Sequence, residues 1–181
     1  MLLKIIKLLI YFFLKTLALI RDIINTKKMN NYFIILAAGS GKRFNYSRPK
    51  QYFVYKNKQL FEHSLEKSLE SKLFNKIILV VKNPGKFKKK FPNRVLVIKG
   101  GKERSDSSLN ALKIIKKFKP NNVLIHDAAR PNFSIKLIKR ILKELKKYSS
   151  VVPVTNPKDA LKYKIKNRLF NLEKENSFLT Q

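Results

Sequence analysis

A short loop rich in small residues follows the first continuous apolar run that ends near residue 37. Its members with little or no side chain are Ala37, Ala38, Gly39 and Gly41. Such residues let backbone N–H groups approach a ligand closely and form a concavity that binds anions. Arg43 and Lys50 place positive charge beside this loop, and Pro49 stiffens the return of the chain. The pattern predicts a phosphate-binding loop, with a plain tight turn as the alternative.

The loop matches neither of two common phosphate-binding motifs. The dinucleotide-binding pattern needs a third glycine, and the P-loop needs Gly-Lys-Ser/Thr after a gap of four residues. Both features are absent here. Two further polar segments, GGKERSDS at residues 100–107 and HDAARP at residues 126–131, each follow a later apolar run. Ligands of open α/β sheets bind at the carboxyl ends of the strands, so we expect these segments to meet the loop.

Short β-branched runs alternate with helical periods along the chain, which predicts the elements that position these segments. Strands are expected at residues 32–37, 76–81, 95–98, 122–126 and 150–154. Helices are expected at residues 59–73, 107–118 and 134–147, and a hairpin at residues 160–165 and 169–172. The order indicates an α/β fold: a Rossmann-like, mostly parallel sheet with helices on both faces, plus a β-hairpin arm.

Details of two helices follow from the same pattern. In the helix at residues 107–118 the apolar side chains expected to face inward are Leu109, Leu112, Ile114 and Ile115. Ser134 is expected to cap the N-terminus of the next helix. Ser107 could likewise be a helix N-cap, and Glu103 with Arg104 could form a structural ion pair. His126 and His63 are interpreted as packing residues without a catalytic role.

The composition limits the number of domains, the cysteine chemistry and the partners that the chain could have. The 181 residues suggest one domain plus a short extension, and 41 Lys and Arg against 11 Asp and Glu leave a net charge of +30. The absence of Cys excludes disulfides, thiolate metal sites and a cysteine nucleophile. The charge could indicate nucleic acid or an anionic membrane as a partner. Because the excess is scattered Lys with few Arg and no aromatic ladder, coding bias with solvated faces is favoured, and a basic nucleic-acid-binding protein stays the rival hypothesis.

Residues 1–28 differ in composition from the rest of the chain. They are rich in Leu, Ile and Phe and are interrupted by cations, and the longest apolar run is too short for a membrane-spanning helix. One interpretation is a basic amphipathic helix at a membrane surface. The favoured one is an upstream extension ahead of Met29 as the true start. The expected organisation is therefore an extension at residues 1–28 and one folded domain at residues 29–181.

Four segments in order carry a resemblance to a known family: LAAGSGKRF, PKQY, GGKERSDS and HDAARP. They resemble those of the 2-C-methyl-D-erythritol 4-phosphate cytidylyltransferases of the non-mevalonate isoprenoid pathway. The resemblance implies that residues 29–181 form a nucleotidyltransferase domain that is incomplete at its C-terminus. It further implies transfer of CMP from CTP to that acceptor with release of pyrophosphate, with Mg²⁺ as cofactor. It also implies a cytoplasmic homodimer formed through the hairpin around Asn167, with no nucleic-acid partner and with membrane contact only through residues 1–28.

Roles for individual residues also follow from the resemblance. Arg43 and Lys50 would neutralise the triphosphate and stabilise the transition state as the catalytic pair. Asp127, Arg130 and Lys174 would bind the acceptor, and Asp127 could also orient a hydrated Mg²⁺, with no residue assigned as a direct metal ligand. The nucleotide-binding residues would be Ala37, Ala38, Gly39, Gly41, Gly101, Ser107, Asp127 and Ala128.

The acceptor side departs from the family pattern. Ala160 stands where the family has a threonine, Lys174 stands where it has an arginine, and the chain stops at Gln181 near the start of a further family segment. Lys keeps the charge but loses the bidentate fork of Arg. A related polyol-phosphate cytidylyltransferase, a sugar-nucleotide pyrophosphorylase and an inactive truncation product therefore stay open as alternatives. Taken without the resemblance, Asp127 could cap a turn and pair with Arg130.

Overall fold

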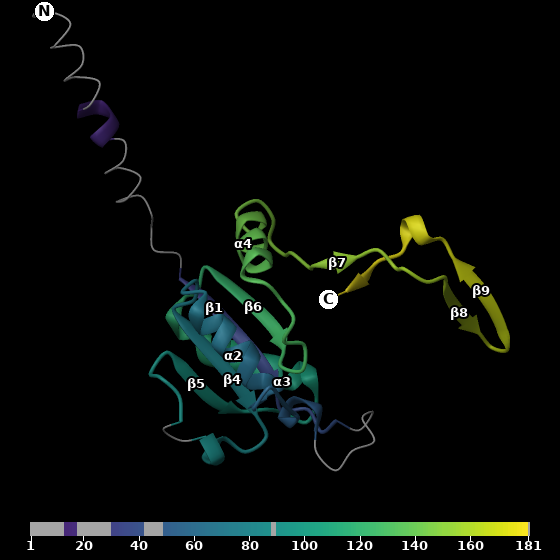
Figure 1. The fold of residues 1–181 in the computed structure, drawn as a ribbon, viewed down its shortest axis with the longest axis horizontal. Helices are drawn as coiled ribbons and strands as arrows, with labels where there is room; N and C mark the ends of the chain where they lie inside the picture. Colours follow the sequence, from purple (N-terminus) through teal and green to yellow (C-terminus); the bar gives the residue numbers. More distant parts are fainter. Residues whose placement is uncertain (1–12, 18–29, 42–48, 88–89, 181) are drawn as a thin grey trace, which may run out of the picture.

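The computed structural model describes residues 13–17, 30–41, 49–87 and 90–180. Within these ranges no helix is long and apolar enough to cross a membrane. Most of the described chain is organised around one central sheet, and a two-stranded arm projects away from it (Figure 1).

The central sheet has four strands in the order β5-β4-β1-β6, all parallel to one another. They are β1 (Asn31–Ala37), β4 (Lys76–Val81), β5 (Val95–Lys99) and β6 (Asn122–Asp127). β1 and β4 lie in the middle and are buried almost throughout. Their continuous apolar sequences are typical of strands that are covered on both faces. The four expected parallel strands are thereby confirmed, each within one residue at either end.

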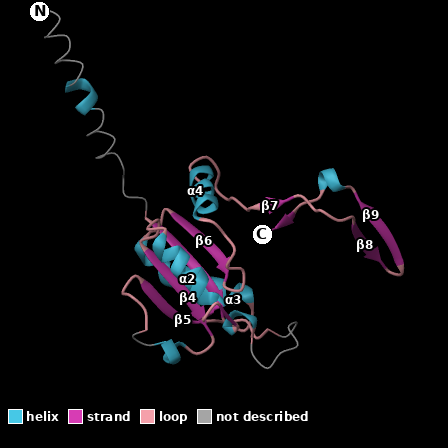
Figure 2. Cartoon of the chain, viewed as in Figure 1, coloured by secondary structure: helices cyan, strands magenta, loops and turns pink. Residues whose placement is uncertain are grey.

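Helices cover both faces of this sheet, as the alternating sequence pattern predicts. α2 (Leu60–Glu70) and α4 (Ile135–Glu144) pack on one face, where Phe61 and Ile138 join the side chains of Phe33 and Leu79. α3 (Arg104–Ile115) packs on the other face (Figure 2). Alternate residues of β1 and β4 therefore contribute to two separate apolar clusters.

The inward face of α3 differs from the expected one. Leu109 and Leu112 are 49% and 38% exposed, so the prediction that they face the core is wrong. The buried positions are Ser107, Ala111 and Ile115. At the start of α3 the small side chain of Ser107 occupies this face because Gly100 lies directly against it, and a leucine periodicity alone does not detect that constraint.

The prediction of a strand at residues 150–154 is wrong in its bounds and its partner. β7 comprises only Val154–Thr155 and pairs antiparallel with β10 (Leu179–Thr180), outside the central sheet. Pro153 cannot donate a backbone hydrogen bond, which shortens any strand that contains it. The expected hairpin is confirmed as β8 (Leu161–Ile165) and β9 (Arg168–Leu172), the arm of the molecule.

The remaining elements are short. They are β2 (Val54–Tyr55), β3 (Lys58–Gln59), and the 3-10 turns Lys50–Tyr52, Pro84–Phe87, Lys116–Phe118 and Lys174–Asn176. β2 and β3 form a hairpin whose turn residues Lys56 and Asn57 both have positive φ, as a type I′ turn requires.

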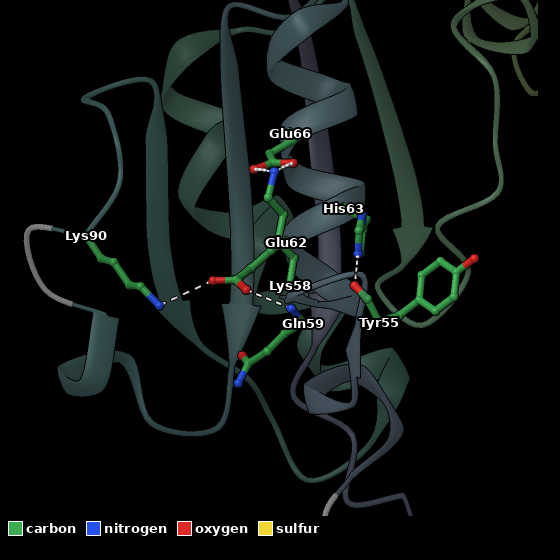
Figure 3. Close-up of polar contacts among 7 residues, drawn as sticks. All are labelled: Tyr55, Lys58, Gln59, Glu62, His63, Glu66 and Lys90. Atoms are coloured by element: carbon green, nitrogen blue, oxygen red, sulfur yellow. Dashed lines mark hydrogen bonds and ion pairs between the residues drawn. The ribbon is translucent and has the colours of Figure 1, made fainter.

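The N-terminus of α2 is fixed by polar contacts to its neighbours (Figure 3). The side chains of Gln59 and Glu62 form a capping box, in which the carboxylate of Glu62 accepts from the Gln59 N–H at 2.8 Å. Lys90 forms an ion pair with Glu62 at 3.3 Å, and Lys58 one with Glu66 at 2.8 Å. The helix that supports the candidate site is therefore held at the end nearest the β2–β3 hairpin.

Candidate active site

The carboxyl ends of the four parallel strands are aligned by their pairing. Ala37 lies opposite Val81, Val81 lies opposite Lys99, and Leu36 lies opposite Asp127. The loop after β1, the glycine segment after β5 and the HDAARP segment at the end of β6 therefore meet at one edge. We call this edge, formed by residues 37–41, 100–107 and 127–131, the rim. The expectation that the three segments meet is confirmed.

The loop after β1 is held by two side chains of the PKQY segment. The amide Nε2 of Gln51 donates to the carbonyl oxygens of Ala37 and Gly39, at 3.0 and 2.6 Å. The hydroxyl of Tyr52 donates to the same Ala37 oxygen at 3.2 Å. Gln51 is only 6% exposed, so its amide replaces water as the partner of these carbonyls. The sequence analysis did not predict this supporting role of Gln51, although its place inside the PKQY segment could have indicated one.

The conformation of Gly41 requires glycine. Its φ is +69°, and a Cβ there would lie 2.9 Å from the Cα of Pro49. The loop therefore passes directly against the returning chain at Pro49. This contact places Lys50, the first residue of the Lys50–Tyr52 turn, next to the small-residue loop. Arg43, the other cation expected here, lies outside the described residues.

The glycine pair after β5 allows close packing between the rim segments. A Cβ on Gly100 would overlap the Cβ of Ala38, and one on Gly101 would overlap the Cβ of Asp106. The N–H of Gly101 donates to Oγ of Ser107 at 3.0 Å. Ser107 is buried, so its hydroxyl joins the glycine segment to the second turn of α3.

Two hypotheses about the start of α3 need correction. The N-cap is Glu103, which forms a capping box with Asp106, so Ser107 is not the N-cap. Arg104 does not pair with Glu103. Its Nε donates to Oδ1 of Asp127 at 2.9 Å instead, because the carboxylate of Glu103 already accepts from the backbone of the first turn.

The end of β6 combines a carboxylate with two guanidinium groups. Oδ2 of Asp127 lies 3.7 Å from Nε of Arg130, so the expected contact between these two residues is present. Ala128 continues the strand pairing, since its N–H donates to the Leu36 carbonyl at 3.1 Å. The Ala128 carbonyl in turn accepts from the Ser64 hydroxyl of α2 at 3.3 Å. The backbone that carries Asp127 and Arg130 is therefore fixed from two sides.

Both histidines have structural surroundings. His126 packs between the rings of Phe33 and Phe133, with ring centroids 5.8 and 4.6 Å away. Burial lowers the pKa of His126 below its ordinary value of 6.5, and within the described part of the chain its Nε2 has no hydrogen-bond partner. Nε2 of His63 lies 2.7 Å from the Tyr55 carbonyl. The interpretation of His126 and His63 as packing residues is consistent with these contacts.

Lys174 is the one acceptor-binding candidate that does not lie at the rim. It belongs to the Lys174–Asn176 turn at the base of the arm, and its Nζ donates to the Lys158 carbonyl at 2.7 Å. In Figure 1 this turn lies beside β9, well away from the ends of β1 and β6. A single chain therefore does not bring Lys174 together with Asp127 and Arg130.

A large groove adjoins the rim on the side of β6. It has a volume of about 1150 Å³ and runs between β6, α4 and residues 149–155. Arg104, Asp127 and Arg130 line its end at the rim. Among the described residues, no three Asp, Glu or His side chains come together as a ready metal site. The rim is thus suited to bind anionic ligands through the cations Arg104 and Arg130 and through the exposed backbone of the loop at Gly39.

A parallel α/β sheet with a small-residue loop and cations at its carboxyl edge is an arrangement typical of nucleotide-binding proteins. Residues 32–177 match the model of the family described as IspD: 2-C-methyl-D-erythritol 4-phosphate cytidylyltransferase. The chain belongs to this family.

Individual relatives agree with this assignment. A bifunctional enzyme IspD/IspF of Pelagibacter ubique is 48% identical over 84% of this chain and 42% of its own length. A 2-C-methyl-D-erythritol 4-phosphate cytidylyltransferase of Thermotoga neapolitana is 35% identical over 72% of this chain and 61% of its own length. The chain thus spans less than two thirds of these curated relatives.

Solved structures show the same fold. The cytidylyltransferase (IspD) of Francisella tularensis superposes with a TM-score of 0.69 at 30% identity, covering 84% of this chain and 70% of that one. The bifunctional IspDF of Campylobacter jejuni superposes with a TM-score of 0.71 at 28% identity, covering 84% of this chain and 39% of that one. These superpositions confirm the expected α/β fold.

Proposed function

We propose that this chain transfers CMP from CTP to 2-C-methyl-D-erythritol 4-phosphate and releases pyrophosphate, in the cytoplasmic synthesis of isoprenoid precursors. A phosphate oxygen of the acceptor attacks the α-phosphorus of CTP, and the bond from that phosphorus to the β-phosphate bridging oxygen breaks. The attacking oxygen is already anionic, so the step needs no strong general base. The observation that carries the proposal is the meeting of three family segments at the rim.

The nucleotide would bind between the loop after β1 and the glycine segment after β5. Ala37, Ala38, Gly39 and Gly41 present backbone close to the triphosphate, and the hydrogen bonds from Gln51 hold the loop for that purpose. Gly101 and Ser107 would contact the cytosine, with Asp127 and Ala128 completing the pocket. Backbone groups at Gly101 can distinguish the cytosine amino group from the uracil carbonyl, since one donates and the other accepts.

Catalysis would depend on cationic side chains that are already in position before the substrates react. Negative charge increases on the oxygens around the α-phosphorus, and fixed cations lower such a barrier by several kcal/mol. Lys50 follows Pro49, which packs so closely on Gly41 that a Cβ there would lie 2.9 Å from the Pro49 Cα. The backbone of Lys50 is therefore held against the loop. Arg43 is assigned the second cationic role from the sequence.

We propose Mg²⁺ as the metal of this transfer, bound chiefly by the phosphates of the substrate. Mg²⁺ keeps several waters and binds chiefly to substrate phosphates with one or two carboxylates. Asp127 supplies a carboxylate at the rim. Because Arg104 and Arg130 already lie against this carboxylate, it would contact the ion through a water molecule of the hydration shell and not as a direct ligand. When bound, the ion would neutralise the departing pyrophosphate.

The acceptor site would be completed by a second copy of the chain. Asp127 and Arg130 lie at the rim, whereas Lys174 lies on the arm. The arm exposes apolar side chains, namely Tyr163, Ile165, Leu169, Phe170 and Leu172. An isolated two-stranded hairpin is only marginally stable in water, so burial of these side chains against a partner copy would stabilise it. A homodimer would thereby bring Lys174 of one copy to the rim of the other.

A panel of substrates tests the proposal. Pyrophosphate release is measured with CTP or UTP, and with 2-C-methyl-D-erythritol 4-phosphate, ribitol 5-phosphate or a sugar 1-phosphate as acceptor. The proposal predicts turnover with CTP and the methylerythritol acceptor. Preference for ribitol 5-phosphate would favour a related polyol-phosphate enzyme, an alternative left open by the departures at Ala160 and Lys174. Preference for a sugar 1-phosphate would favour a pyrophosphorylase.

A second candidate function, binding of a nucleic acid, is favoured by one surface. The exposed face of α4 and the turn after it carry six cations: Lys136, Lys139, Arg140, Lys143, Lys146 and Lys147. Their spacing of three and four residues places them on the side opposite Ile138. Binding to RNA that falls steeply with salt and persists in Lys50→Ala would support this function.

A further inference from the structure

Arg104 links two segments that follow opposite edges of the central sheet. It is the first residue of α3, five residues after the end of β5, and its partner Asp127 ends β6. Strands in a sheet are about 4.8 Å apart, so the edge strands β5 and β6 are separated by roughly 14 Å. The Arg104–Asp127 contact of 2.9 Å therefore joins these segments across the ends of β4 and β1.

The position of Arg104 is unfavourable for the helix that carries it. The N-terminus of a helix has partial positive charge, and a cation in the first turn is destabilising there. The nearby carboxylates of Glu103 and Asp106 are engaged in the capping box of α3. Among the described residues, the ion pair of Arg104 is with Asp127. Helix stability therefore does not account for an arginine at this position.

Asp127 is shared unequally between two arginines. Arg104 contacts Oδ1 at 2.9 Å, a hydrogen-bonding distance, whereas Nε of Arg130 lies 3.7 Å from Oδ2. Both guanidinium groups are more than half exposed at the end of the groove beside β6. Arg130 is thus held only loosely by Asp127 and can turn toward an anionic ligand.

We infer that Arg104 is a positioning residue for acceptor binding: it holds the Asp127 carboxylate and so leaves Arg130 available for the phosphate of the acceptor. The inference rests on the proposed function. Without Arg104, Asp127 would draw Arg130 into a close ion pair, and the acceptor would have to break that pair. The Arg104→Lys variant would keep the charge but lose the planar Nε–H geometry.

The expected effect is larger for the acceptor than for CTP. Arg104→Ala should raise the KM for the acceptor about tenfold and the KM for CTP clearly less, because Asp127 also borders the proposed nucleotide pocket, with kcat reduced less than the acceptor KM is raised. Arg104→Lys should give an intermediate acceptor KM. In the Arg104→Ala background, a further Arg130→Ala change should cost less than it does in the parent chain, because the two effects share one carboxylate.

The experiment measures initial rates of pyrophosphate release over a matrix of both substrates. Arg140→Ala on the exposed face of α4 is the matched control and should keep both KM values. Loss of the slowly exchanging Nε–H signal of Arg104 in the Asp127→Asn variant would support the ion pair in solution. A parent chain without turnover would refute the proposed function. The inference itself is overturned if the parent turns over and Arg104→Ala, or Arg104→Lys where Ala does not fold, leaves the acceptor KM unchanged or raises both KM values equally.

Discussion

The rim and the arm are built in opposite ways. At the rim, buried side chains hold each loop: Gln51 holds the turn after β1, Ser107 holds Gly101, and Ser64 holds Ala128. On the arm, β8 and β9 pair with each other, and the exposed fraction of Leu169 reaches 66%. The rim is complete within one chain, whereas the arm leaves its apolar side chains in solvent.

This difference separates the two halves of the proposed reaction. The nucleotide half needs backbone that a ligand can approach closely, which the small residues of the loop after β1 supply at the aligned strand ends. The acceptor half includes Lys174, which the chain places on the arm. We therefore expect changes in the loop after β1 and in the glycine segment after β5 to act on nucleotide chemistry in each copy, and changes on the arm to act on assembly.

The largest effect is expected at Lys50, the proposed catalytic cation beside the rim. Lys50→Ala should reduce kcat by about 10³-fold, because the proposal places its charge near the α-phosphorus. The free energy of unfolding should change little, since Lys50 is an exposed residue. Single-turnover measurement of pyrophosphate release checks the rate, with Lys139→Ala on α4 as the control. Retention of the parent rate in Lys50→Ala would remove the rim from the mechanism.

The next effect tests the arm. Leu169→Asp should weaken dimerisation by about 100-fold or more, because a charge would be buried in a desolvated contact. Sedimentation velocity over a range of protein concentrations measures the change, and the control is Tyr148→Asp at another exposed position outside the arm. A Leu169→Asp protein that stays as dimeric as the control would contradict a role of the arm in assembly.

A smaller effect is expected from closing the space between rim segments. Gly100→Ala would place a methyl group against the Cβ of Ala38 and should cost about 1–3 kcal/mol of stability, with weaker CTP binding. Gly85→Ala is the matched control, since nothing lies within 4 Å of a Cβ there. Urea denaturation of both variants measures the free energies of unfolding. Equal stability of the two would show that the glycine pair is not needed for packing.

The smallest effect concerns His126 beneath the rim. Burial lowers its pKa in the folded protein, so the unfolded chain binds a proton first as the pH falls through about 6.5. Stability contributed by neutral His126 is therefore present above pH 6.5 and is lost as the pH falls toward the lower pKa of the folded state. His126→Phe should flatten this dependence in urea denaturation between pH 7 and pH 5. An unchanged slope would mean that other groups cause it.

Much of the sheet can be predicted from the sequence because its strands are apolar on both faces. The pattern predicts the strand at Lys76–Val81 with the bounds it has. The order of motifs also predicts which strand ends meet. Prediction fails where a tertiary contact overrides the local pattern: α3 buries Ala111 rather than Leu109, and Arg104 pairs across the sheet rather than with Glu103. Partners distant in sequence leave no periodic signal, and neither does the support from Gln51.

The central claim is that the rim binds the phosphates and base of CTP. Calorimetric titration of the chain with CTP in the presence of Mg²⁺, and then with UTP, tests it most directly. We predict saturable binding with one CTP per chain, much weaker binding of UTP, and loss of CTP affinity in the Lys50→Ala variant. Absence of CTP binding by folded protein, or equal affinity for CTP in the parent and the Lys50→Ala variant, would contradict it.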